Sequence, residues 1–408
     1  MLQTLTTKGK SARIIEEKDF SIHLYDTLIG HENDWDEVLE GSNVLLSSNF
    51  LKAIQEYPPI GMQFRYIILK TKQDEAFGLL YYQLQYFNAA QSLSEKENKN
   101  SPCFFNTIQK FLKGLVAKQV EFNTFVCGNL LLTGENGFYF KKGSFAEENL
   151  FKIISTTSER VQEDLNYSGI QCNVCLMKDY PIEIKELGAA LTEKYYHEFC
   201  IQPCMMMKLN PSWKSFDDYL DALQSKYRIR AKRAIKKSHH VEKRELSLEE
   251  IKEFQAEIYQ LYLGVAENAG FNTVNLDAGY FYGLKKHLGD RFHLFAYFNN
   301  EKMVGFYTII GNNEEAEAHF LGYDKQENAH SQLYLNTLYD IIDFSIQSGF
   351  KRINFSRTAL EIKSSVGAVP QEMICYMKHR NKFSNKFLRP ILDYLNPTVD
   401  WKQRHPFK

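Results

Sequence analysis

The sequence has 408 residues, of which 44% are hydrophobic and 24% are charged, and its formal net charge is −1. This length favours two domains over one core, and the near-zero charge excludes a global attraction to nucleic acid or membranes. Residues 1–20 carry several charges and no apolar run, and no stretch is long enough to span a bilayer. We therefore expect a cytoplasmic protein without stable membrane insertion.

The seven cysteines include one pattern that resembles a zinc site. Cys172 and Cys175 are followed by Cys200 and Cys204. However, residues 169–177 are typical of a buried strand, and alternation along a strand would place Cys172 and Cys175 on opposite faces. We predict reduced core thiols and no metal site.

The first half, residues 1–194, shows alternating helix and strand patterns. In a helix over 33–40, capped by Asn33 or Asp34, Trp35, Val38 and Leu39 form the apolar stripe. The other predicted elements are a helix over 48–56, a hairpin of strands 64–70 and 77–86, a polar loop over 91–100, a helix over about 102–117, strands near 122–127 and 137–140, a helix from 147 to about 166, and a strand through 172–177.

The second half, residues 195–380, repeats this alternation, and residues 381–408 form a basic tail. The predicted elements are a strand over 205–209, a long basic helix over 216–237, a helix over 248–268, strands 292–298 and 302–310 around an Asn299-Asn300 turn, a strand over 316–323, a helix over 331–348 ended by Gly349, and strands 352–355 and 373–379.

The two halves contain similar hairpins. In each, two helices precede an apolar strand, and the returning strand carries an early glycine, Gly78 in the first half and Gly305 in the second. A glycine inside a strand usually marks a bulge or a close backbone approach. The shared layout predicts duplicated halves.

The densest cluster of charge is the predicted basic helix over 226–237. Arg230, Arg233 and Lys237 are three and four residues apart, so they share one helix face. Such crowded cations favour a groove for a phosphate-rich group, such as coenzyme A, a tRNA acceptor stem or a lipid-linked phosphate. The alternative is a solvated helix face.

A second candidate is the strand that ends in Gly322-Tyr323-Asp324. Strand alternation places His319 and Tyr323 on one face, where they could accept and donate the protons that amine acylation requires. The alternative is a pair of half-buried strand residues.

A third candidate follows the predicted strand over 352–355, where α/β proteins often place ligands. Arg357, Glu361 and Lys363 concentrate charge there, and Arg357 could clamp a carboxylate or phosphate. The alternative is a surface ion pair made by Glu361.

Taken in order, these features resemble the branch of the GNAT superfamily related to Fem-type peptidyltransferases. The resemblance covers about 215–367 well and the first half more loosely. It implies an α/β protein of α+β type with two GNAT-like halves, the first degenerate, each a mixed, largely antiparallel splayed sheet flanked by helices. It also implies an acyl donor between diverging central strands, with backbone N–H groups near Tyr323 facing the donor carbonyl. Arg230, Arg233, the 322–324 turn, Arg357 and Lys363 match characteristic positions of that branch.

One segment departs from the pattern of acetyl-CoA users. Their pyrophosphate-binding turn is rich in glycine, whereas residues 325–334 contain none. Either the donor phosphates are held by the basic helix and Arg357, or the donor is not a CoA thioester. The Fem-type resemblance implies aminoacyl-tRNA as that other donor.

We therefore predict a transferase that moves an acyl or aminoacyl group, from acyl-CoA by preference, to an amine, with no permanently bound cofactor. His319 or Asp324 would deprotonate the acceptor, Tyr323 or Tyr334 would protonate the leaving group, and Arg357 and Lys363 would hold anionic groups. The alternatives are a tRNA-dependent Fem-type peptidyltransferase and a non-catalytic protein that binds RNA or an envelope precursor.

Overall fold

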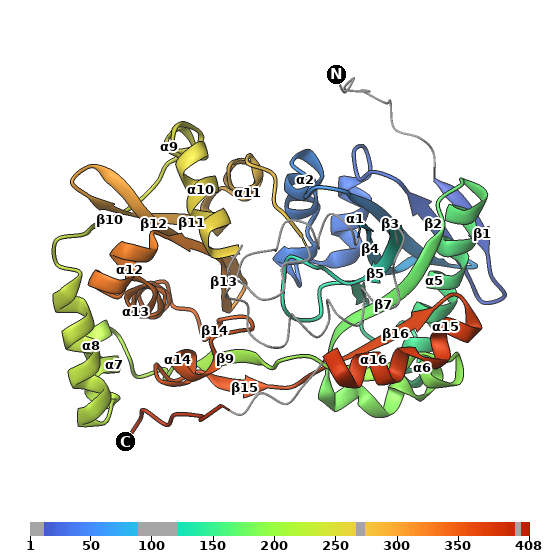
Figure 1. Ribbon diagram of the computed structural model, residues 1–408. Helices are drawn as coiled ribbons and strands as arrows, with labels where there is room; N and C mark the ends of the chain where they lie inside the picture. Colours follow the sequence, from blue (N-terminus) through green and yellow to red (C-terminus); the bar gives the residue numbers. More distant parts are fainter. Residues whose placement is uncertain (1–11, 89–120, 267–273, 396–400) are drawn as a thin grey trace. The chain divides into compact units, whose positions relative to one another are not determined.

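The computed structural model describes residues 12–88, 121–266, 274–395 and 401–408, so the predictions for 91–100 and 102–117 lie outside it. The chain divides into two compact units (Figure 1). The first contains Met1–Ile201 and Met373–Pro397, and the second contains Gln202–Glu372 and Thr398–Lys408.

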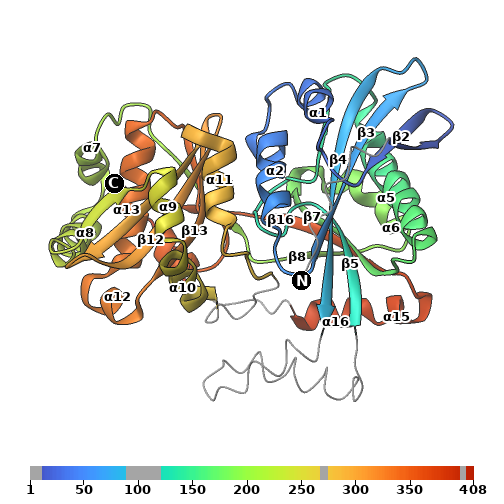
Figure 2. The ribbon, with the colours of Figure 1, turned by 90° about the horizontal axis from the view of Figure 1, so that it is seen from above.

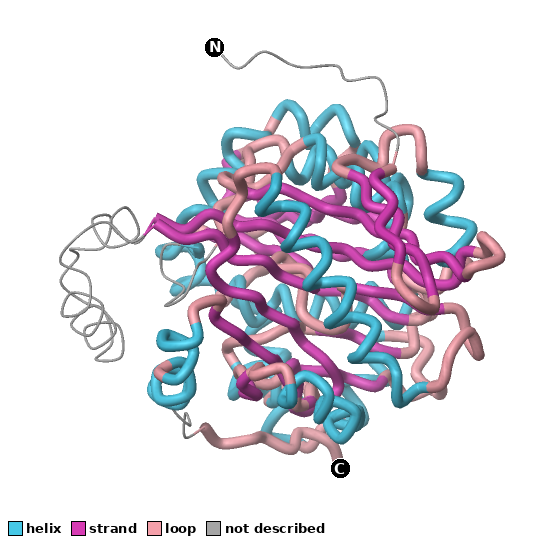
Figure 3. The backbone as a smooth tube through the Cα atoms, turned by 90° about the vertical axis from the view of Figure 1, so that its right-hand side faces the viewer, coloured by secondary structure: helices cyan, strands magenta, loops and turns pink. Residues whose placement is uncertain are grey.

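The first unit is built on a mixed sheet with the strand order β1-β2-β3-β4-β5-β7-β16-β8, and β6 pairs with β4. Its strands lie side by side behind a helix in Figure 3. The strands are β1 (Arg13–Glu16), β2 (Phe20–Tyr25), β3 (Met62–Thr71), β4 (Ala76–Asn88), β5 (Glu121–Cys127), β6 (Phe138–Phe140), β7 (Cys172–Pro181), β8 (His197–Cys200) and β16 (Met373–His379). The helices are α1 (Glu32–Leu39), α2 (Ser48–Glu56), α5 (Leu150–Tyr167), α6 (Ala189–Glu193), α15 (Lys382–Lys386) and α16 (Leu388–Leu395).

The second unit has the strand order β10-β11-β12-β13-β14-β9-β15. Helices α9, α10 and α11 cover one face of this sheet, and α8, α12 and α13 cover the other (Figures 1 and 2). The strands are β9 (Cys204–Lys208), β10 (Glu242–Glu245), β11 (Phe292–Asn299), β12 (Lys302–Asn312), β13 (Glu315–Tyr323), β14 (Arg352–Asn354) and β15 (Val369–Gln371). The helices are α7 (Phe216–Ala222), α8 (Ser225–Lys237), α9 (Leu248–Glu253), α10 (Gln255–Ala266), α11 (Tyr280–Leu288), α12 (Lys325–Ser331), α13 (Leu333–Gln347) and α14 (Leu360–Ser364).

The two sheets share one topology, which confirms the predicted duplication. In the first sheet, the antiparallel hairpin β3–β4 is followed by β5, which pairs in parallel with β7, and β7 pairs antiparallel with β16. In the second sheet, the hairpin β11–β12 is followed by β13, which pairs in parallel with β14, and β14 pairs antiparallel with β9. Both hairpins carry a bulge at the residue before the predicted glycine, Phe77 before Gly78 and Val304 before Gly305. The strand glycines mark bulges, as expected.

The fifth strand of the first sheet comes from the second half of the sequence, whereas the fifth strand of the second sheet comes from the start of that half. Residues 373–379 form β16 of the first sheet, and 204–208 form β9 of the second. The predicted second half, 195–380, therefore includes β8 and β16, which belong to the first unit. The tail over 381–408 is likewise divided, because α15 and α16 lie in the first unit and 401–408 in the second.

Three local predictions were wrong. The helix over 216–237 is broken at Leu223 and Gln224, which are extended because Leu223 bridges to Phe407. The residue before α1 is His31, and it provides no side-chain cap. The β11–β12 turn contains Asn300 and Glu301, both with positive φ, one residue later than expected.

The core thiols are confirmed for Cys172 and Cys175, which are both buried free cysteines. The prediction that they lie on opposite faces of the strand was wrong, because both belong to the same hydrophobic cluster. A bulge at Asn173 adds one residue between the strand pairs, so the alternation is reset.

Candidate active site in the second unit

The central strands β13 and β14 separate soon after they begin to pair. They are joined by three residue pairs, of which Glu317 with Asn354 is the last. β13 continues to Tyr323 against β12, whereas β14 ends at Asn354. Among the described strands, none pairs with residues 318–323 on the β14 side. We call residues 318–323 the open edge of β13.

The backbone beyond β14 turns away from this edge. Ser356, Thr358 and Ala359 all have positive φ, between 48° and 68°, and α14 follows at once. These left-handed residues prevent a continued strand. The predicted divergence of the central strands is therefore present in the second unit.

The N–H groups of Leu321 and Tyr323 point toward the open edge. The N–H of Asp324 donates to Val304 O, and the N–H of Phe320 donates to Thr308 Oγ1, both on β12. Because N–H groups alternate along a strand, the Leu321 and Tyr323 amides face the opposite side. The edge thus presents two backbone donors, as an acyl carbonyl requires.

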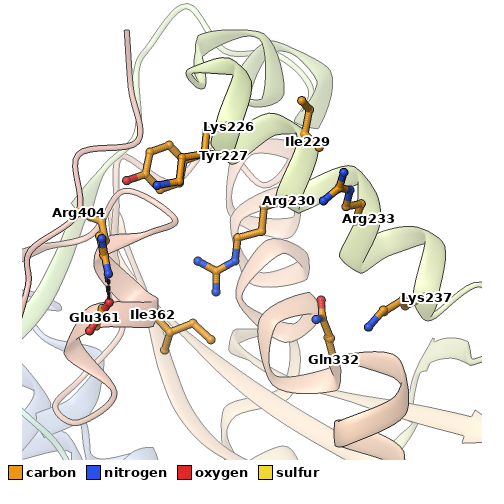
Figure 4. A pocket seen from close by; sticks show the side chains of 10 residues that line it. All are labelled: Lys226, Tyr227, Ile229, Arg230, Arg233, Lys237, Gln332, Glu361, Ile362 and Arg404. Atoms are coloured by element: carbon orange, nitrogen blue, oxygen red, sulfur yellow. Dashed lines mark hydrogen bonds and ion pairs between the residues drawn. The ribbon is translucent and has the colours of Figure 1, made fainter.

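A cavity of about 810 Å³ lies where α8 faces the elements that follow β13 and β14 (Figure 4). Gln332, at the start of α13, and Glu361 and Ile362, on α14, form the side opposite α8. The complete lining is Lys226, Tyr227, Ile229, Arg230, Arg233, Lys237, Gln332, Glu361, Ile362 and Arg404. Because α12 and α13 follow β13 and α14 follows β14, Gln332, Glu361 and Ile362 come from the segments that leave the diverging strands.

The cavity is strongly cationic. Five of its side chains are lysine or arginine and one is a carboxylate, Glu361, which forms an ion pair with Arg404. Figure 4 shows Arg230 reaching from α8 toward the centre. Arg230, Arg233 and Lys237 share one helix face, as predicted. Like charges gathered around a hollow repel one another unless an anion lies between them, so this arrangement suits a phosphate or carboxylate.

Helix α12 takes the place of the glycine-rich turn. Asp324 caps it, since its Oδ1 accepts hydrogen bonds from the Gln326 and Glu327 N–H groups, both at 2.9 Å. Gln332 then adopts a left-handed conformation, with φ 55°, and begins α13. Asp324 thus holds the turn, and the first amides of α13 lie beside a cavity residue.

His319 and Tyr323 do not share a face, and this prediction was wrong. β13 has one extra residue opposite Thr308, because Tyr307 pairs with Leu321 and Ile309 with Ala318. The bulge turns His319 toward α11, where its Nε2 lies 2.8 Å from the Tyr280 hydroxyl. Tyr323 packs on the other side, with the α8 and α13 cluster.

Tyr323 and Tyr334 lie together beyond the bulge, with ring centroids 6.1 Å apart. Burial raises the pKa of both hydroxyls, so they remain protonated at neutral pH. Burial also lowers the pKa of His319 to about 3, which leaves its imidazole neutral. The two tyrosines can donate a proton, whereas His319 is a weak acceptor.

Arg357 and Lys363 do not line the cavity. Arg357 Nε donates to Gln202 O at 2.7 Å. Lys363 is buried, and its Nζ donates to the carbonyls of Phe355 and Arg357 at 2.5 Å each. Desolvation lowers the pKa of Lys363 to about 7. Lys363 therefore fixes the turn that carries β14 away from β13.

Sequence reasoning missed Glu317, which lies where the open edge begins. It is 4% exposed, and its Oε1 accepts from Asn354 Nδ2 at 3.0 Å. Burial and the neighbouring Glu315 raise its pKa well above the usual range. An acidic residue inside an apolar strand was the available signal. Arg404 was also missed, because it reaches the cavity from the tail and no local pattern predicts that.

No family model and no curated protein matches the sequence. Among solved structures, the chain is similar to FemX, with 11% identity over 88% of this chain and 98% of that one and a TM-score of 0.52. It is also similar to a tandem GNAT protein from the clavulanic acid biosynthesis pathway, with 7% identity over 89% and 99% and a TM-score of 0.50. The chain therefore has the FemAB-like fold with two GNAT-like halves, as predicted.

Proposed function

We propose that the chain is a transferase that moves an acyl or aminoacyl group from an activated donor to an amine, with acyl-CoA as the favoured donor. The observation that carries this proposal is the open edge of β13, which lies in the same unit as a cavity lined by five cations. The cavity would bind the anionic part of the donor, and the edge amides would bind the carbonyl that becomes an oxyanion.

The amine would attack this carbonyl directly. The leaving thiolate or alkoxide would then take a proton from Tyr323 or Tyr334, whose raised pKa keeps each hydroxyl protonated. The Asp324 carboxylate is already bonded to two amides of α12, so we no longer assign it the base role predicted from the sequence.

The amine proton would pass to the face of β13 that carries Glu317 and His319. Ala316 and Ala318 belong to the α13-facing cluster, so Glu317 between them faces the other way, toward the side where His319 meets α11. Glu317 is the stronger candidate, since its raised pKa gives its carboxylate, once ionised, a higher proton affinity than an imidazole whose pKa is about 3.

Aminoacyl-tRNA is the second candidate donor. The observation that favours it is α12, which replaces the turn used to bind pyrophosphate. The exposed side of α8, with Lys232 and Lys236, could contact a tRNA backbone beyond the cavity.

The test uses two matched double variants of α8. Arg230→Glu/Arg233→Glu reverses charge in the cavity, and Lys232→Glu/Lys236→Glu reverses it at exposed residues that do not line the cavity. Thermal stability is measured with acyl-CoAs of graded chain length, and filter binding to tRNA is measured at two salt concentrations.

Stabilisation by an acyl-CoA that is lost only in the cavity variant supports the favoured donor. Binding to tRNA alone, lost in the cavity variant and reduced in the control, supports the second donor. If no acyl-CoA binds and tRNA binding falls equally in both variants, the non-catalytic RNA-binding alternative replaces the proposal.

A further inference from the structure

Four aromatic side chains of the first unit are more than half exposed. Tyr167, Phe383 and Tyr195 are 94%, 72% and 71% exposed, the highest values among the large hydrophobic side chains of the described residues. Phe387 is 54% exposed and lies beside Phe383, with ring centroids 5.1 Å apart. We call these four residues the aromatic surface. Water contact with so much ring area is unfavourable, so a covering partner would stabilise it.

Hydrogen bonds tie the parts of the aromatic surface together. Asn385, between the two phenylalanines, donates from Nδ2 to the Tyr195 carbonyl at 2.9 Å. Arg380 Nη1 donates to Asn166 Oδ1 at 2.9 Å, next to Tyr167. These bonds bring together the segments that carry the four aromatic residues, namely the end of α5, the segment before β8, and α15.

The segment that carries Phe383 and Phe387 is basic. Residues 373–392 contain no aspartate or glutamate, and they include five lysines or arginines at 378, 380, 382, 386 and 389. Arg380, Lys382, Lys386 and Arg389 are all exposed. Because the chain carries a net charge of −1, this is a local excess of positive charge.

We propose that the aromatic surface and its basic rim form a docking site for an anionic lipid bilayer. Exposed aromatic rings beside lysine and arginine are the combination that inserts shallowly at the headgroup level of anionic membranes. Within the described ranges no helix is both long and apolar enough to cross a bilayer, so the contact would be peripheral.

The ring geometry favours lipid over nucleic acid. Bases stack on open, flat ring faces, whereas Phe383 and Phe387 meet edge to face at 62° and form an apolar knob. The tyrosines beside the knob have a polar tip and an apolar ring, which suits the boundary between headgroups and acyl chains.

The test is flotation of the full chain with vesicles of phosphatidylcholine containing roughly 30 mol% phosphatidylglycerol, and with phosphatidylcholine alone. The wild type should float with the anionic vesicles and not with the neutral ones. Phe383→Ala/Phe387→Ala and Lys382→Glu/Lys386→Glu should each weaken binding about tenfold or more. Ile29→Ala/Ile60→Ala, two residues of the first unit that are 53% and 65% exposed, is the matched control and should bind as the wild type does.

Unchanged thermal stability would show that the variants fold, and it is expected because all six substituted residues are exposed. The proposal is overturned if the wild type does not float with anionic vesicles, or if the phenylalanine variant binds them as well as the control does. It is also overturned if the same variant instead loses RNA binding, or dissociates a dimer detected by light scattering.

Discussion

β5 of the first unit and β13 of the second have the same place in the same topology, but they differ along one edge. β5 is paired with β7 through to its last residue, Cys127, which lies opposite Met177. β13 is released by β14 after Glu317, and its last six residues face no strand on that side among the described residues. Within the described part of the chain, the first sheet is therefore closed at this position, whereas the second leaves the outward amides of Leu321 and Tyr323 without a strand partner.

Each unit has a buried lysine that holds a loop beside its sheet. Lys178, within β7, bonds the loop that follows β5, and Lys363, on α14, bonds the loop that follows β14. In the first unit Lys178 forms an ion pair with Asp179 and donates to Leu132 O at 2.7 Å. In the second, Lys363 donates to carbonyls, and no carboxylate of the described residues is ion-paired with it. The two lysines thus hold different loops, and of the two Lys178 alone does so next to a buried carboxylate.

The largest expected effects come from exchanging these lysines for methionine. Lys178→Met removes the ion-pair partner of the buried Asp179 carboxylate, and should lower the free energy of unfolding by about 3–5 kcal/mol. Lys363→Met leaves the Phe355 and Arg357 carbonyls without a donor, and should cost about 2 kcal/mol. Urea denaturation at pH 7 measures both. A larger loss in Lys363→Met than in Lys178→Met would contradict the comparison.

The stability of the second unit should depend on pH through Lys363. The pKa of Lys363 is lowered from 10.5 to about 7, so the unfolded chain binds more protons between these values. The unfolding free energy of the wild type, relative to Lys363→Met, should therefore rise by about 1.4 kcal/mol per pH unit from about pH 7 to 10 and stay level below that. A difference that falls over this range would show that the lysine is charged in the folded state.

Removal of one hydroxyl from each unit should separate catalysis from stability. Tyr323→Phe should lower turnover about 10²-fold without unfolding, because the leaving group loses a proton donor. Tyr82→Phe, which breaks a 2.9 Å hydrogen bond with Ser158 in the first unit, should leave turnover unchanged and cost about 1 kcal/mol of stability. Steady-state kinetics and thermal melts distinguish the two. Equal turnover in both variants would remove Tyr323 from the mechanism.

The smallest expected effects are those of the two hairpin glycines. A Cβ at Gly78 would lie 2.5 Å from the Phe140 ring, and one at Gly305 would lie 3.2 Å from the Gly322 carbonyl. Each alanine variant should lose about 1 kcal/mol of stability. Gly305→Ala should also lower turnover several-fold, because Gly305 pairs with Tyr323. If Gly78→Ala reduces turnover as much, the active centre is not confined to the second unit.

Local patterns predicted the parts of the fold that depend on nearby residues. Residues 48–56 and 373–379 form the predicted helix and strand with the same bounds, and the cationic face of α8 lines a cavity. The membership of residues 373–379 in the first sheet was not predictable, since nothing within this segment specifies which sheet it joins. The break at Leu223 depends on Phe407, which is distant in sequence.

The candidate site was predicted only in part, because the missed features also depend on residues that are distant in sequence. Alternation was applied to β13 without its bulge, so His319 was placed beside Tyr323. The bulge depends on Thr308, whose hydroxyl bonds both the N–H and the carbonyl of Phe320. Lys363 was interpreted as a ligand-binding cation, because burial by tertiary packing is not visible from a charged segment in the sequence.

The most direct test of the central claim is residue-resolved amide hydrogen exchange with and without the donor that supports turnover. If the donor carbonyl binds at the open edge of β13, exchange at the Leu321 and Tyr323 amides should slow, and exchange along β5 from Asn123 to Cys127 should not change. Unchanged exchange at Leu321 and Tyr323 under saturating donor, or protection confined to β5, would contradict the account.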